Sequence, residues 1–264
     1  MAIADVLTPT AGPRAIYGIN PVAKLAATAV IGIALVLSID WVSATVALAC
    51  EVVLFVFAGL GPRQFVRRTL PVAIAAIFAA TTILLYGRAS GANHWRFLLI
   101  NVTDGSIELS IATFLRVLAI GLPAVVLFVT VDPTDLADGL AQVLRLPSRF
   151  VLGALGGLRL VGLFAEDWKS LELARRARGI ADSGRLRRFA GQAFALLVLS
   201  IRRGSKLATA MEARGFGSSI PRSWARASLF GAREWMLVAL AFAIVLAAVG
   251  TSVLTGHWNF LAEA

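Results

Sequence analysis

The sequence predicts an all-α polytopic integral membrane protein with about five transmembrane helices and a cytoplasmic region of amphipathic helices. Of its 264 residues, 58% are apolar and 15% are charged, and the mean hydropathy is +0.82. Soluble domains have about 45–50% apolar and about 25% charged residues. Five apolar segments are long enough for a bilayer core, which needs about 20 residues of helix. A basic stretch of about 100 residues separates the fourth segment from the fifth.

The expected spans are residues 22–39, 41–60, 70–86, 107–131 and 235–255. Asn20 can cap the first span, and Pro21 fits its first turn. Trp41 suits an interfacial anchor at the start of the second. Residues 189–201 form a sixth candidate, but this segment has only 13 residues between two arginine pairs. That length suits an interfacial or buried helix better than a span, although the sequence leaves a crossing open.

The distribution of charge predicts the orientation. The short connection 61–69 carries three arginines and no acid, whereas the turn before the second span has only Asp40. Residues 132–233 hold 17 basic and 8 acidic residues, which accounts for +9 of the net charge of +10. Because basic segments stay in the cytoplasm, we expect a plasma-membrane protein with its N-terminus inside and its C-terminus outside. The expected regions are 1–131 with four spans, 132–233 as the cytoplasmic region, and 234–264 with the last span.

The cytoplasmic region is too long for a connection and too apolar for a disordered tail. Asp132 and Pro133 predict a helix start, with an acidic cap and proline in the first turn. Pro147 ends that helix and opens a second one that could run to Arg178. A small-residue pair in the second helix, Gly153 and Gly157, is typical of close helix packing. We therefore expect packed helices over these residues.

Two similar sequences end expected helices in this region. Residues 174–180 (ARRARGI) and 210–216 (AMEARGF) share the sequence Ala-Arg-Gly followed by an apolar residue. Glycine commonly ends a helix, and arginine in the last turn complements the helix dipole, so capping alone explains one copy. Two copies with the same flanks favour a paired docking device. Arginine suits this role because its planar fork binds carboxylates or carbonyl groups and stays charged.

These motifs resemble the transmembrane T component of energy-coupling factor (ECF) transporters. The resemblance also includes residues 20–24 (NPVAK), Leu115-Arg116, and residues 130–144, and it covers the chain from about residue 18 to 230. It implies a subunit that links two cytoplasmic ABC ATPases to a small membrane-embedded substrate-binding subunit. The coupling residues that it implies are Ala177, Arg178, Gly179, Ala213, Arg214 and Gly215. One departure is residues 159–162 (RLVG), where the family often has a proline.

The sequence excludes several other functions. No phosphate-binding Gly-x-x-x-x-Gly-Lys-Ser/Thr loop and no catalytic Ser, Cys or His motif occurs, so the expected subunit is non-catalytic and has no cofactor. ATP and Mg²⁺ would be bound by the partner ATPases. One cysteine and two histidines argue against a resident metal site. The resemblance implies import of a vitamin or a transition-metal ion such as cobalt, and no nucleic-acid partner. The alternatives are a conventional ABC importer permease and an intramembrane enzyme.

Two charged residues fall inside expected spans. Glu51 lies near the middle of the second span and Arg116 within the fourth. A charge at that depth is costly and usually pairs inside the protein. We therefore expect an ion pair between Glu51 and Arg116. The alternative is that Glu51 is protonated or faces a partner subunit.

Overall fold

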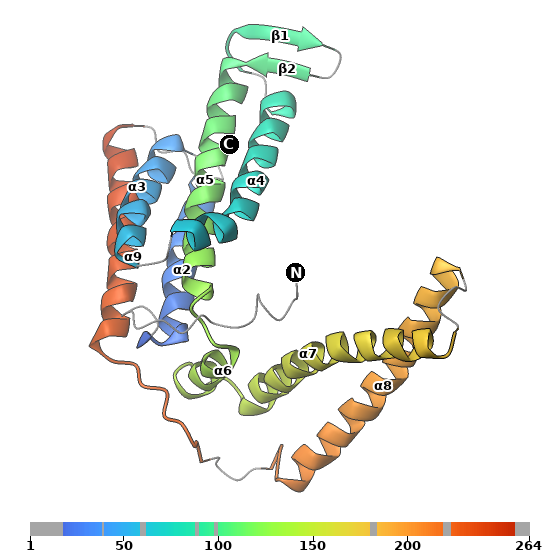
Figure 1. Ribbon diagram of the computed structural model, residues 1–264. Helices are drawn as coiled ribbons and strands as arrows, with labels where there is room; N and C mark the ends of the chain where they lie inside the picture. The colour runs from blue at the N-terminus through green and yellow to red at the C-terminus, as the bar shows by residue number, and fades with distance from the viewer. Residues whose placement is uncertain are drawn as a thin grey trace. The chain divides into compact units, whose positions relative to one another are not determined.

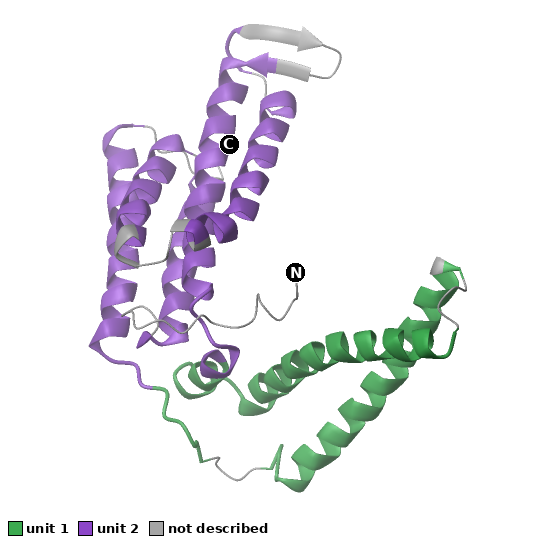
Figure 2. Ribbon diagram, in the orientation of Figure 1, with its two compact units in different colours: residues 1–8, 137–228 green, residues 9–136, 229–264 purple. Residues whose placement is uncertain are grey.

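The chain forms two compact units. Figure 1 shows the computed structural model, which describes residues 18–38, 40–58, 62–87, 90–97, 100–179, 184–218 and 223–256. Unit 1 comprises residues 1–8 and 137–228, and unit 2 comprises residues 9–136 and 229–264 (Figure 2). Within the described residues, the chain passes from unit 2 to unit 1 after Leu136, which we call the first crossing. It returns after Ser228, which we call the second crossing.

The described residues of unit 2 form five long helices, one for each span expected from the sequence. They are α2 (Pro21–Leu37), α3 (Trp41–Ala58), α4 (Pro62–Tyr86), α5 (Asp104–Phe128) and α9 (Ala232–Leu254). In Figure 1, α4 lies along α5, and α2 and α3 both pack against α5 and α9. The expectation of a helical polytopic membrane protein is confirmed.

Two details of unit 2 differ from the expectation. The basic connection expected at 61–69 is largely helical, because α4 begins at Pro62 and continues through Pro71. Proline suits the first turn of a helix, where its missing N–H would have no partner, so Pro62 can start α4. A two-stranded antiparallel hairpin, β1 (Asn93–Phe97) and β2 (Ile100–Thr103), also precedes α5. The all-α prediction did not include this hairpin.

Small residues dominate the buried core of unit 2. Its fully buried members include Ala27, Ala47, Ala119, Ala241 and Ala248, together with Ile31, Leu35, Leu127 and Ile244. Without a large hydrophobic driving force between membrane helices, small side chains stabilise them by allowing close approach. The large apolar side chains point outward instead; Phe78 is 69% exposed and Leu246 is 72% exposed. This distribution suits helices surrounded by lipid.

The described residues of unit 1 form the end of α6 (Pro133–Gln142) and two long helices. The last residues of α6 pack on the start of α7 (Ser148–Ala177) through Ala137, Ala141 and Val151. α7 is followed by α8 (Arg185–Ala213). The helix start at Pro133 and the opening of the next helix at Pro147 agree with the expectation, but α6 ends at Gln142, before this proline.

Four helices are long and apolar enough to cross a membrane, judged by length and composition among the described residues. They are Phe65–Tyr86, Asp104–Phe128, Ser148–Ala177 and Ala232–Leu254, and Pro21–Leu37 and Trp41–Phe55 are shorter apolar helices. α7 therefore qualifies although it lies in the region expected in the cytoplasm. The sixth candidate, 189–201, is part of α8, which does not qualify. The two termini, 1–17 and 257–264, lie outside the described residues.

Candidate functional site

The first Ala-Arg-Gly sequence ends α7. Ala177 is the last helical residue, and Arg178 is the C-cap with φ −87° and ψ 3°. The Arg178 N–H donates to the Ala174 carbonyl at 3.2 Å, and the Gly179 N–H donates to the Arg176 carbonyl at 3.1 Å. Gly179 has φ 68°, in the left-handed region that glycine adopts without steric cost. The expected glycine stop is confirmed here.

The second sequence ends α8 with the same geometry. Arg214 is the C-cap with φ −92° and ψ 13°, and Gly215 has φ 77°. The Gly215 N–H donates to the Glu212 carbonyl at 2.9 Å, and the Phe216 N–H donates to the Met211 carbonyl at 2.9 Å. These two hydrogen bonds form a Schellman motif. The corresponding residue of the first copy, Ile180, lies outside the described residues.

Both motifs are exposed on the surface of the described chain. All six residues are exposed: Ala177, Arg178, Gly179, Ala213, Arg214 and Gly215. Within the described part of the chain, neither Arg178 nor Arg214 forms an ion pair, whereas the neighbouring Arg176 pairs with Glu172 at 2.7 Å. A Cβ added at Gly179 would meet no atom within 4 Å. The glycine therefore serves the backbone turn rather than packing within the chain.

Contacts between α7 and α8 place the two Ala-Arg-Gly motifs near opposite ends of α8. The rings of Trp168 and Phe189 lie 5.6 Å apart, and Arg203 Nη2 lies 2.8 Å from Asp167 Oδ1. These contacts join the C-terminal half of α7 to α8, so the first motif is near the start of α8. The second motif is at the other end of α8, which has 29 residues. At about 1.5 Å per residue, α8 is roughly 43 Å long.

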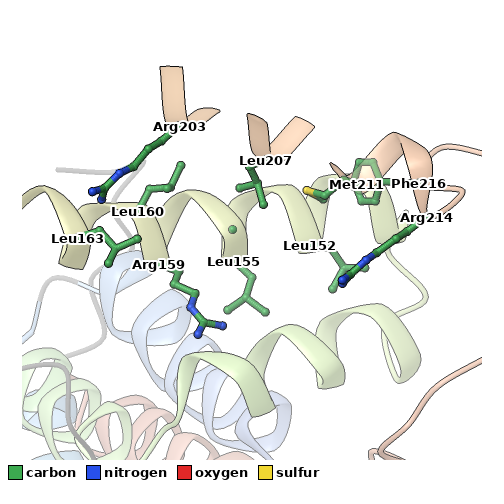
Figure 3. Close-up of a pocket in the computed structure, with 11 residues that line it drawn as sticks. Leu152, Leu155, Arg159, Leu160, Leu163, Arg203, Leu207, Met211, Arg214 and Phe216 are labelled. Atoms are coloured by element: carbon green, nitrogen blue, oxygen red, sulfur yellow. The ribbon is translucent and has the colours of Figure 1, made fainter. Parts of the chain in front are cut away.

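A groove of about 670 Å³ lies between α7 and α8. Figure 3 shows leucines of one face of α7 opposite Leu207 and Met211 of α8. Three arginines also line it, Arg159, Arg203 and Arg214. The second motif is therefore continuous with an apolar groove, whereas the first is not among its lining residues. This difference between the two copies was not evident from their sequences.

The expected ion pair between Glu51 and Arg116 is absent. Both carboxylate oxygens of Glu51 are buried without a hydrogen-bond partner among the described residues. Arg116 donates instead to the backbone carbonyl of Ser38. The Glu51 side chain is 2% exposed, so it does not face a partner subunit either. Residue depth along a helix was deducible from the sequence, but the face on which each charge lies was not.

Sequence reasoning missed a buried polar cluster at the start of α3, which Ser38 connects to Arg116. Asp40 is buried and accepts hydrogen bonds from the Ser43 N–H at 2.7 Å and the Ser43 hydroxyl at 2.8 Å. The Ser252 hydroxyl of α9 donates to the same carboxylate at 2.6 Å. Asp40 thus caps α3 and binds α9. A lone acid directly before an apolar helix was the available signal.

The described residues hold no cluster of metal ligands, and residues 204–206 do not form a phosphate-binding loop. No group of three or more His, Cys, Asp or Glu side chains among them could hold a metal ion. Gly204, Ser205 and Lys206 lie inside α8, so their N–H groups belong to a helix rather than to a phosphate-binding loop.

Comparisons with known proteins agree with the family resemblance. The family model described as "CbiQ: Cobalt transport protein" matches residues 13–223. A protein of Exiguobacterium sibiricum named energy-coupling factor transporter transmembrane protein EcfT is 28% identical over 210 residues, which are 73% of this chain and 80% of the relative. The protein of the same name from Lactobacillus helveticus is 25% identical over 247 residues, covering 89% of this chain and 88% of the relative. That from Limosilactobacillus fermentum is 28% identical over 172 residues, 61% of each chain.

Proposed function

This chain belongs to the CbiQ family and is a transmembrane T component of an ECF transporter, and from this premise we propose that it couples two ABC ATPase subunits to a membrane-embedded substrate-binding subunit. The chain transmits motion and performs no chemistry itself. ATP and Mg²⁺ are bound by the ATPases. The imported substrate is a vitamin or a transition-metal ion, and the name of the matching family model favours cobalt.

The pair of arginine-bearing helix ends is the observation that carries this proposal. Arg178 and Arg214 follow the last residues of α7 and α8 in the same backbone conformation, and both are exposed. Their guanidinium groups are available to carboxylates or carbonyl groups of another protein. Capping the helix accounts for the glycine but leaves the side chain of each arginine without a role in the described chain.

The separation of the two ends supports two partners rather than one. The motifs stand near opposite ends of α8, a helix roughly 43 Å long. Two ATPase subunits can each receive one helix end at that separation. We propose that unit 1 lies on the cytoplasmic side, because most of the positive charge is in this part of the chain.

Replacing the two arginines tests the proposal. We expect Arg178→Ala and Arg214→Ala each to lower copurification of the ATPases with this chain, and the double variant to abolish it. Removing one partner of a desolvated charged pair costs about 2–5 kcal/mol, which is a loss in affinity of about 30-fold or more. Lysine at either position should restore binding poorly, because an ammonium group cannot reproduce the bidentate fork.

Arg176→Ala is the matched control. This arginine lies in the same last turn of α7 but pairs with Glu172 inside the chain. Its loss should leave the amount of bound ATPase unchanged. If the arginines only complement the helix dipoles, alanine costs at most about 1 kcal/mol of helix stability and lysine substitutes well. Wild-type copurification of the ATPases with the double alanine variant would falsify the coupling assignment.

A further inference from the structure

Within the described residues, both crossings between the units are tied to one short segment at the start of α2. The first crossing follows Leu136 and the second follows Ser228. Residues 20–24 of unit 2 hold the chain beside each crossing, by side-chain hydrogen bonds that connect positions more than 100 residues apart. The two ties involve different residues and different atoms.

Lys24 holds the chain before the first crossing. Its side chain is 1% exposed, and its Nζ donates to the Thr130 hydroxyl at 2.7 Å and to the Thr130 carbonyl at 3.2 Å. Thr130 lies just beyond the end of α5, where a cation also complements the helix dipole. Asp135, in the first turn of α6, interacts electrostatically with the same ammonium group. One buried cation therefore joins the end of α5 and the start of α6 to α2.

Asn20 holds the chain after the second crossing. Its side-chain amide donates to the Leu229 carbonyl at 2.9 Å, and its backbone N–H donates to Glu234 Oε1 at 3.2 Å. Glu234 in turn accepts from the Gly231 N–H at 2.8 Å and so caps α9. The Asn20 carbonyl-type oxygen Oδ1 also accepts from the Val22 N–H at 3.0 Å, which caps α2. The residue that starts α2 thus also fixes the return of the chain into α9.

A single side chain makes the matching connection within unit 1. The Gln142 side chain, at the end of α6, donates to the Arg226 carbonyl at 2.8 Å and accepts from the Ser228 N–H at 2.9 Å. The segments that leave and re-enter unit 2 are therefore held together on the unit 1 side as well. At the first crossing eleven residues separate Thr130 from Gln142, and at the second crossing Ser228 and Leu229 are adjacent.

We propose that Asn20 and Lys24 are positioning residues that hold both crossings to the start of α2, so that motion of unit 1 is passed to the membrane helices rather than absorbed by slack in the chain. This inference rests on the proposed coupling function. The role of the two residues is to keep the two connections short and stiff.

Distance measurements between spin labels on the two units test the inference. Labels at Ser90→Cys and Ser218→Cys, both exposed, are placed in a Cys50→Ala background. The full-length chain in lipid nanodiscs should show a narrow distance distribution. We expect Lys24→Met with Asn20→Ser to broaden it. Serine keeps the cap of α2 but lacks the amide donor to Leu229.

Two variants serve as controls. Thr130→Ser keeps the hydroxyl that accepts from Lys24, so it should retain the wild-type width. Ser110→Ala removes a hydrogen bond of 2.8 Å between α5 and the Ala80 carbonyl of α4, away from both crossings. It should also retain that width. A loss of helix packing in general would affect Ser110→Ala as well, whereas the inference confines the effect to residues 20 and 24.

The same labels in the complex with copurified ATPases give the second readout. The Lys24→Met, Asn20→Ser variant should keep ATP hydrolysis but lose the ATP-dependent shift in distance that the wild-type complex shows. An unchanged distribution in the isolated variant overturns the inference. If the wild-type chain binds no ATPase, the proposed function fails, and the width of the isolated chain still decides the role of Asn20 and Lys24.

Discussion

Glu51→Met should stabilise the protein, because it removes a buried carboxyl group that has no partner. The Glu51 side chain is 2% exposed, and neither of its carboxylate oxygens finds a hydrogen-bond donor among the described residues. Leaving a buried polar group unsatisfied costs about 1–3 kcal/mol. Methionine has a similar length and an unbranched shape, so it fills the same space with apolar atoms. We therefore expect the free energy of unfolding to rise by about 1–3 kcal/mol.

Chemical denaturation in detergent micelles, followed by tryptophan fluorescence, measures this change. Glu51→Gln is the polar comparison: its amide is equally unsatisfied, so it should give no comparable gain. Glu108→Met replaces an exposed acid of α5 and should change the free energy by less than about 0.5 kcal/mol. A loss of stability of more than about 1 kcal/mol in Glu51→Met would refute the reasoning, because the carboxyl group would then have a favourable partner.

Two further predictions concern the cap of α3 and the orientation. Asp40→Ala should lower the free energy of unfolding by about 1–3 kcal/mol, because it leaves the buried Ser43 N–H without an acceptor. Asp40→Asn keeps an oxygen at this position, so it should cost less in the same denaturation assay. In a Cys50→Ala background, Ser90→Cys should react with an impermeant maleimide added to intact cells, and Ser218→Cys should not. Labelling of Ser218→Cys from outside would contradict the cytoplasmic placement of unit 1.

Properties that depend on local sequence were predictable. Apolar runs of sufficient length predicted the helices of unit 2, because a bilayer requires helix wherever the chain crosses it. Pro133 and Pro147 indicated where α6 and α7 begin, since proline has no N–H to donate within a helix. The two glycines indicated the ends of α7 and α8, because only glycine adopts the left-handed conformation at little cost. Each inference used residues within one or two turns of each other.

The sequence by itself determined the helices, the repeated helix ends and the membership of the family, while the tertiary structure decided which polar side chains meet. Lys24 was recognised only as part of a motif, yet its partner Thr130 is 106 residues away. Arg116 was assigned to Glu51, but it donates to the backbone carbonyl of Ser38, directly after α2. The depth of a residue in the membrane and the period of the apolar residues follow from the sequence of one helix alone. A contact between helices depends on the rotation of both about their axes, which the packing of small residues such as Ala47 and Ala119 sets only once the chain has folded.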